Sequence, residues 1–195
     1  MIEYFEKTLQ TLTNSLKTLK SETFDAITKD CKQILENGGK IIASGLGKNV
    51  PICEKFVGTM NSFTLDARFL HTNTAVHGDL GMITKDDLVI ILSKSGNTEE
   101  SVLLNSYLVE RGCKVWLLSC NEKSKLSEVV ENKIIIPLED EGDLWNISPN
   151  NSTTLYLMFL QGLAVELCKQ MDIKLVDYKK NHPGGGIGQL LKNVN

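Results

Sequence analysis

Residues 87–98 read DLVIILSKSGNT, a continuous apolar run that passes directly into a loop of hydroxyl side chains and one glycine. Two acidic residues, Glu99 and Glu100, follow at the start of an amphipathic run that continues to Arg111. An unbroken apolar strand is typical of a parallel sheet covered on both faces, whereas a strand with one solvated face alternates apolar and polar residues. The stretch therefore predicts a buried strand, a polar loop and a helix in succession.

The same plan recurs along the chain. Residues 40–44 lead into Gly45-Leu46-Gly47 and a helix-like stretch at 49–62, further apolar runs lie at 113–119 and 132–137, and 64–70 is a weaker candidate strand. Strands that alternate with helices predict an α/β fold with a parallel sheet. Such sheets bind ligands beyond the carboxyl ends of their strands, so we expect functional residues in the loops that follow the strands.

Residues 2–38 have the period of helices instead. Their apolar side chains recur at steps of three or four, which predicts two helices, and Gly38-Gly39 suits the end of the second. We expect one domain over 1–195, with an N-terminal helical extension at 1–38 and an α/β core at 39–195.

Composition excludes several classes of protein. Of 195 residues, 42% are hydrophobic and 23% are charged, which is ordinary for a globular domain and excludes a disordered or collagen-like chain. The net charge of -3 gives no reason to expect a nucleic-acid partner. The five cysteines form no CxxC pair, which predicts a reduced protein without a disulfide framework or zinc site. No signal peptide or membrane-length apolar run is present, so we expect a cytoplasmic protein with no membrane partner.

Two loops between a strand and a helix are candidate anion sites. The loop at 93–98 carries three hydroxyls, and a helix start offers unpaired N–H groups with partial positive charge. The alternative is that these hydroxyls only cap the helix. The second loop is Ser44-Gly45-Leu46-Gly47-Lys48, where a lysine could reach a phosphate or an oxyanion. It lacks the third glycine of a dinucleotide fingerprint, and 93–98 is not a Walker A loop, so neither predicts a nucleotide cofactor.

Other candidates are two histidines and an acidic cluster. His77 and His182 lie in glycine-rich segments, and a loop histidine titrates near neutral pH and can transfer protons. Residues 139–143 read EDEGD and follow the last predicted strand. These carboxylates could act as bases or merely solvate a loop, and their spacing does not match a magnesium site. We therefore predict no metal.

Five motifs in order make the chain resemble the sugar isomerase (SIS) domain family, and more narrowly the arabinose-5-phosphate isomerase group. They are SGLGK at 44–48, HGDLGMIT at 77–84, SKSGNTEE at 93–100, SPNNSTT at 148–154 and NHPGGGIGQLL at 181–191. The resemblance covers about residues 30–192. It implies a three-layer α-β-α sandwich with a five-stranded parallel sheet, in a homodimer or homotetramer with sites near subunit interfaces.

The resemblance also implies a phosphosugar ligand and no cofactor. The residues expected to bind substrate are Ser44, Gly45, Ser93, Ser95, Asn97, Thr98 and Ser152, and those matching catalytic positions are Lys48, His77, Glu141 and His182. The chain departs from the family pattern at Asn97 and Thr74, where glutamate is usual, and at Asn49, where serine is usual. Many members carry a C-terminal pair of CBS domains, and we expect none in a chain of 195 residues.

These matches predict an aldose–ketose isomerase that works through an enediol. We expect Glu141 to be the base, with a pKa raised toward neutrality by enclosure against sugar and protein. His182 would open the sugar ring from a neighbouring subunit, Lys48 would stabilise the enediolate, and His77 is the alternate acid or base. Two alternatives stay open: a non-catalytic phosphosugar sensor, and an isomerase of a different pentose or hexose phosphate.

Overall fold

The five apolar runs each form a strand of one parallel sheet. The structure, a computed structural model, describes residues 2–194, and its sheet has the order β2-β1-β3-β4-β5 with every neighbouring pair parallel. The strands are β1 (Ile41–Gly45), β2 (Ala67–His71), β3 (Leu88–Leu92), β4 (Lys114–Ser119) and β5 (Asn132–Ile135). The five-stranded parallel sheet is confirmed, and the weaker candidate at 64–70 is a strand displaced toward its C-terminal side.

Eight α-helices and three short 3-10 turns connect these strands within residues 2–194. The helices are α1 (Ile2–Leu16), α2 (Ser21–Glu36), α3 (Val50–Ser62), α4 (Glu99–Glu110), α5 (Lys125–Val129), α6 (Asn151–Gln170), α7 (Leu175–Lys180) and α8 (Gly185–Leu190). The turns are η1 (Gly47–Asn49), η2 (Ala75–His77) and η3 (Asp79–Met82). The sequence did not predict α5, α7 or α8, which are too short to show a helical period.

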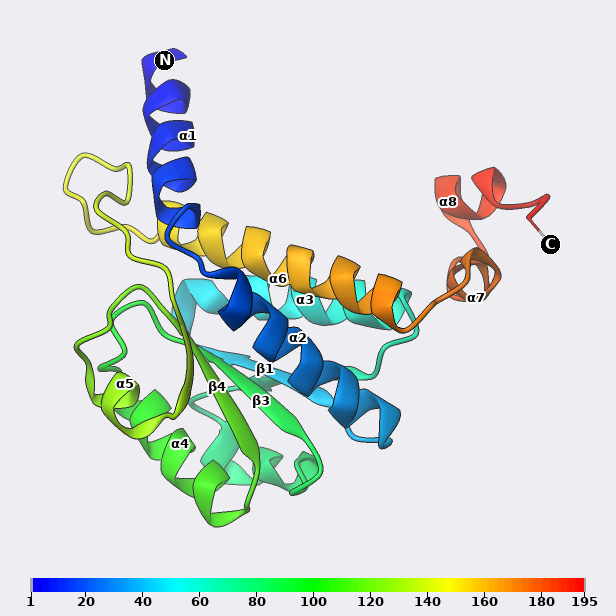
Figure 1. Cartoon of the computed structure of the whole chain (residues 1–195), viewed down its shortest axis with the longest axis horizontal. Coiled ribbons are helices and arrows are strands. Elements are labelled where there is room, and N and C mark those ends of the chain that lie inside the picture. Colours follow the sequence, from blue (N-terminus) through cyan, green and yellow to red (C-terminus); the bar gives the residue numbers. More distant parts are fainter. Residues whose placement is uncertain (1, 195) are drawn as a thin grey trace.

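The central strands are buried on both faces, and alternate side chains enter two separate cores. Ile41, Ala43 and Ile90 pack with α2, α3 and α6 on one face. Ile42 and Ile91 face the opposite way, toward α4, α5 and the η2–η3 segment. Figure 1 shows the helices on either side of the sheet, which confirms the three-layer sandwich. The continuous apolar runs are explained, since a strand covered twice has no polar face.

The two N-terminal helices differ in how they pack. Helix α2 lies against α6 and the sheet, whereas α1 projects from the body (Figure 1). Phe5 and Leu9 of α1 are 56% and 64% exposed, while Leu12 is buried. The apolar stripe of α1 is therefore only partly covered within this chain. Helices α7 and α8 lie at the opposite end of α6.

Two further observations concern the chain as a whole. All five cysteines are free, and Cys31 and Cys53 are fully buried in the core. Of the helices that residues 2–194 form, none combines the length and apolar character needed to cross a membrane.

Candidate active site

The loop at 93–98 is held in one shape by a glycine and by the next loop along the sheet. Gly96 has φ +66°, and a Cβ at this position would lie 2.1 Å from Ser124 Oγ. The Asn97 Oδ1 accepts a hydrogen bond from the Lys125 N–H at 3.0 Å, and Asn121 Nδ2 donates to the Ser95 carbonyl at 3.0 Å. Only glycine fits this close crossing, because other residues would add both a clash and backbone strain. Asn97 therefore anchors the loop.

The hydroxyls of this loop are not used as helix caps. Thr98 occupies the N-cap position of α4 but makes no side-chain capping bond, and its Oγ1 lies 3.4 Å from Ser93 Oγ. Ser95 is exposed, and its Oγ accepts a bond from the Asn97 N–H at 3.2 Å. The first N–H groups of a helix have no partners within the helix. Ser95 and Thr98 thus lie beside unpaired donors, which is the arrangement expected for binding an anion.

The loop after β1 approaches the same edge of the sheet. Gly45 lets η1 and the first turn of α3 pack closely, since a Cβ there would lie 2.8 Å from Asn49 Cβ and 3.1 Å from Cys53 Sγ. Asn49 Nδ2 in turn donates to the Leu92 carbonyl at the end of β3 at 3.2 Å. Lys48 is exposed in η1. Ser44 is fully buried and its Oγ lies 2.9 Å from Thr72 Oγ1, so in this structure it supports the neighbouring strand and does not present its hydroxyl to solvent.

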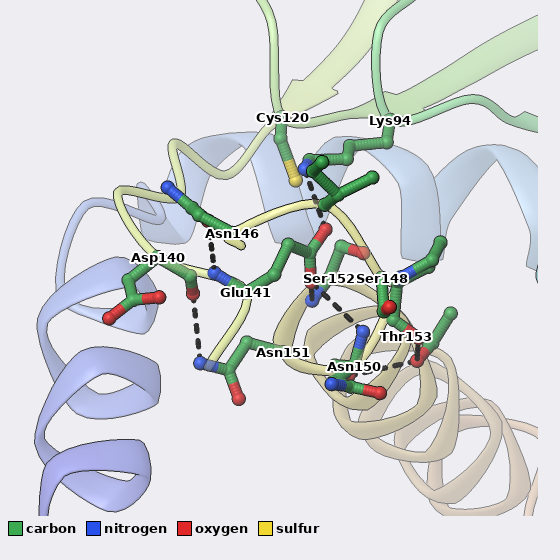
Figure 2. A network of polar contacts seen from close by, with 12 residues as sticks. Lys94, Cys120, Asp140, Glu141, Asn146, Ser148, Asn150, Asn151, Ser152 and Thr153 are labelled. Atoms are coloured by element: carbon green, nitrogen blue, oxygen red, sulfur yellow. Dashed lines mark hydrogen bonds and ion pairs between the residues drawn. The ribbon is translucent and has the colours of Figure 1, made fainter. Parts of the chain in front are cut away.

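Glu141 is the most enclosed carboxylate at this edge. Its side chain is 1% exposed, and its Oε1 lies 2.7 Å from the ammonium of Lys94, the lysine within the hydroxyl loop. The Oε2 accepts bonds from the Asn150 N–H at 3.0 Å and the Ser152 N–H at 2.9 Å, at the start of α6 (Figure 2). The Glu141 carboxylate therefore joins the loop after β3, 47 residues away, to the loop after β5 and the first turn of α6 that follows it.

Enclosure by the protein alone does not raise the pKa of Glu141. Burial does raise the pKa of the carboxyl group, but the Lys94 ammonium and the donors of Ser152 and Asn150 outweigh it and lower the pKa below its ordinary value. The sequence showed that the group would be enclosed and could not show that a cation and a helix N-terminus enclose it. Glu141 is thus held as an anion.

Ser152, Cys120 and Tyr156 lie beside Glu141. Ser152 is 1% exposed and its Oγ has no hydrogen-bond partner among the described residues, which leaves a donor free at the start of α6. Cys120 follows β4 and its Sγ lies 3.4 Å from the hydroxyl of Tyr156, a residue of α6 with no exposed surface. Burial raises the pKa of both the Cys120 thiol and the Tyr156 phenol, so both stay neutral near pH 7.

Neither histidine makes a hydrogen bond or an ion pair with this cluster among the described residues. His77 ends η2 on the segment after β2 and is solvent-exposed. His182 stacks on Tyr178, with ring centroids 4.1 Å apart. Its neighbour Asn181 donates to the carbonyls of Asn61 and Ser62 at the end of α3. Because α3 starts at the carboxyl end of β1 and runs back, its last residues lie at the amino edge of the sheet, away from Glu141.

Sequence reasoning missed two participants. Lys94 lies between two serines of the hydroxyl loop, and a cation at that place was a visible signal. Thr72, the partner of Ser44, carried no sequence signal because it follows a weakly marked strand. The structure brings together the 93–98 loop, Glu141 and Ser152, and the Asn49 hydrogen bond to Leu92 ties the end of the 44–48 loop to the end of β3. His182 lies apart from them. Of the residues described, no three His, Cys, Asp or Glu are grouped to hold a metal ion.

Comparison with known proteins gives a consistent set of relatives. A family model described as SIS domain matches residues 34–166. Proteins named arabinose 5-phosphate isomerase KdsD from Pseudomonas aeruginosa and Francisella tularensis are 31% and 32% identical over 186 and 193 residues, 95% and 97% of this chain. The matches cover 57% and 58% of those relatives, so the chain spans little more than half their length.

A solved structure resembles the whole described fold. An Escherichia coli CFT073 protein, solved in complex with a phosphosugar, superposes with a TM-score of 0.85 at 28% identity. The superposition covers 92% of this chain and 94% of that one. The sequence match, the family model and the shape therefore agree on one relationship.

Proposed function

Since this chain belongs to the SIS domain family, we propose that it is a phosphosugar aldose–ketose isomerase resembling D-arabinose 5-phosphate isomerase. The observation that carries the proposal is the meeting of the hydroxyl loop and Glu141 at one edge of the sheet, joined by the Lys94 ion pair of 2.7 Å. A phosphate on the loop would place the sugar carbons beside a carboxylate. The proposal includes no cofactor.

The anchoring group is the phosphate. Ser93, Ser95 and Thr98 surround the start of α4, where hydroxyls and helix N–H groups donate to an anion without adding a charge. Asn97 fixes the loop through the Lys125 N–H. A phosphate monoester bound at this point has a fixed orientation, and holding the sugar in place is itself a large part of catalysis.

The chemistry then requires one proton to move. After ring opening, a base removes the proton from the carbon beside the carbonyl, a cis-enediol forms, and the proton returns to the neighbouring carbon. Glu141 is our proposed base, and a positioned base contributes roughly 10²–10⁴-fold. Lys48 would stabilise charge on the former carbonyl oxygen, and His77 is the alternate acid or base.

We also propose that the working form is a homodimer or homotetramer in the cytoplasm. His182 lies away from Glu141 in its own chain, so ring opening by His182 needs the site of a neighbouring copy. The exposed side chains of Phe5 and Leu9 on α1 offer an apolar surface for such contacts.

The relatives indicate which sugar to test first. Two of them are named arabinose 5-phosphate isomerases, and the E. coli protein was solved with a phosphosugar bound. Thr74 and Asn97 stand where the family has glutamate, which favours a test of other pentose and hexose phosphates alongside arabinose 5-phosphate.

A non-catalytic phosphosugar sensor is the second candidate. Its supporting observation is that Glu141 is already engaged by Lys94 and two backbone N–H groups, and carries a lowered pKa. In that reading the carboxylate only holds α6 and the hydroxyl loop together, and the sugar binds without reacting.

One experiment separates the two. Sugar phosphates that raise the thermal midpoint are incubated in D2O, and NMR follows aldose–ketose conversion and deuterium uptake at the carbons that exchange a proton. We expect wild type to convert an aldose phosphate and Glu141→Gln to lose about 10²–10⁴-fold of the rate. Glu139→Gln makes the same chemical change at an exposed carboxylate of the same loop and should match wild type. If wild type bound a sugar phosphate without converting it, the sensor function would be established. If Glu141→Gln converted the sugar at a near-normal rate, Glu141 would not be the base.

A further inference from the structure

Lys94 belongs to one functional segment by its backbone and to another by its side chain. Its backbone lies between Ser93 and Ser95 in the hydroxyl loop, and its carbonyl accepts bonds from Ser119 Oγ at 3.1 Å and the Cys120 N–H at 3.3 Å. Its side chain is 41% exposed and reaches across to Glu141 (Figure 2). The backbone is therefore fixed, while the four-carbon stem is free to turn.

The surroundings of Glu141 make it a weak base as long as this contact lasts. The loop after β3 contributes the Lys94 ammonium, and α6 contributes the Asn150 and Ser152 N–H groups. The other titratable groups facing it, the Cys120 thiol and the Tyr156 phenol, are neutral near pH 7. Within residues 2–194, Lys94 is thus the one cationic side chain that pairs with the Glu141 carboxylate. A carboxylate with a low pKa provides little driving force for taking a proton from carbon.

We propose that Lys94 couples phosphate binding to the activity of Glu141: its ammonium pairs with the carboxylate before a phosphosugar binds and turns to the phosphate ester afterwards. This inference rests on the proposed phosphate site at 93–98. In it Lys94 is a positioning residue for Glu141 and a contact of the phosphate, and the sugar phosphate itself releases the base that acts on it.

The physical reason is competition of two anions for one ammonium. A phosphate monoester carries nearly two negative charges near pH 7, against one on the carboxylate, and lysine is a compact point charge on a flexible stem. Loss of the cation from Glu141 leaves a buried carboxylate with only neutral donors, so its affinity for a proton increases. Coupling between two sites is reciprocal, so removing the charge of Glu141 must also strengthen phosphate binding.

The reciprocal effect can be measured without any turnover. Binding of inorganic phosphate to the full chain is followed by titration calorimetry in wild type, Glu141→Gln, Lys94→Met and the double variant. We expect Glu141→Gln to bind phosphate roughly 5-fold or more tightly than wild type, which is the low end of typical coupling. Lys94→Met should bind phosphate more weakly than wild type. The double variant should bind phosphate as weakly as Lys94→Met alone. Lys123→Met and Glu139→Gln, which make matched changes at exposed residues nearby, should bind like wild type.

The double variant decides between coupling and simple repulsion. Equal tightening by Glu141→Gln with and without Lys94 would mean that the carboxylate only repels phosphate, which overturns the inference and leaves the proposed function standing. Failure of wild type to bind any phosphate, inorganic or sugar-linked, would overturn both.

A kinetic measurement on an active substrate gives a second, independent readout. The pH profile of kcat/KM reports the free enzyme and that of kcat reports the substrate complex. Lys94→Met should move the acid limb of kcat/KM to higher pH, since Glu141 loses its cation in the free protein, and should leave the acid limb of kcat in place. A purely structural role for Lys94 would lower the rate at all pH values without separating the two profiles, and that result would contradict the coupling.

Discussion

Replacing Gly96 with any other residue should destabilise the folded protein. Its φ of +66° and the 2.1 Å approach of a Cβ to Ser124 Oγ both forbid a side chain. We expect Gly96→Ala to lower the free energy of unfolding by about 2 kcal/mol or more. It should also weaken phosphosugar binding, because the hydroxyl loop would have to move away from Ser124. Urea denaturation and thermal shift with ligand measure the two effects.

Gly58 provides the matched control for this substitution. It lies on the exposed side of α3, and a Cβ there would meet no atom within 4 Å. Alanine in a helix restricts the unfolded chain, so Gly58→Ala should stabilise the protein by about 0.5–1 kcal/mol. If Gly96→Ala and Gly58→Ala changed the free energy of unfolding equally, the contact between Gly96 and Ser124 would not be tight.

At the scale of single residues, the sequence showed which side chains follow the strands but not the charges that face them. Ser95, Thr98 and Glu141 could be singled out because short motifs show which side chains follow a strand. The contact between Lys94 and Glu141 joins residues 47 positions apart, so it depends on how two loops meet in space. The lowered pKa of Glu141 in the protein alone has that origin: burial was visible in the sequence and the partner was not.

Among the elements, α6 depends most on one side chain outside it. The helix has 20 residues, Asn150 at its N-cap position makes no side-chain capping bond, and Glu141 accepts two of its first N–H groups instead. A carboxylate near a helix N-terminus is stabilising because it complements the helix dipole. Glu141 therefore links the last loop of the sheet to the longest helix.

This link predicts a pH dependence of stability. The pKa of Glu141 in the folded protein lies below its ordinary value of 4.5, so ionised Glu141 favours folding above that pH. We expect wild type to exceed Glu141→Gln in free energy of unfolding at pH 7. The difference should shrink as the pH falls below 4.5 and Glu141 becomes protonated in the folded state. Urea denaturation across this range measures it.

The exposed carboxylate of Glu139 is the control for that measurement, since Glu139→Gln alters the charge of the same loop without touching α6. A difference between wild type and Glu141→Gln that stayed constant with pH, or grew in acid, would contradict the link. It would mean that the glutamine changes stability through hydrogen bonds or packing that do not depend on the charge of Glu141.

The elements that the sequence predicted and those it missed differ in length and composition. Continuous apolar runs such as 88–92 are unambiguous, because both faces of the strand are buried. The segment at 75–82, which covers one face of the sheet, consists of two 3-10 turns with a left-handed Gly78 between them, and it has no period to detect. The sequence also gives no helical signal for α8, since four positions in or next to this helix are glycine. Short glycine-rich elements are defined by what they pack against.

For the whole molecule, the two ends of the chain project in different directions. Helix α1 carries exposed apolar side chains at one end, and α7 and α8 lie at the other, with His182 at the amino edge of the sheet (Figure 1). A single copy therefore holds Glu141 and His182 at separate places. Closed symmetric assemblies are the usual way in which such surfaces are covered.

This separation predicts complementation between inactive subunits, for a chain that proves to be an isomerase. Glu141→Gln and His182→Ala should each be nearly inactive alone. If His182 acts in a neighbouring copy, a mixed dimer joins the intact Glu141 of one chain to the intact His182 of the other. Unfolding and refolding the two variants together at equal amounts should then restore up to about a quarter of the wild-type sites. The NMR assay measures the recovered rate, and light scattering confirms the assembly. A His182 that serves its own chain gives no recovery, because every site then lacks one of the two residues whatever the mixture.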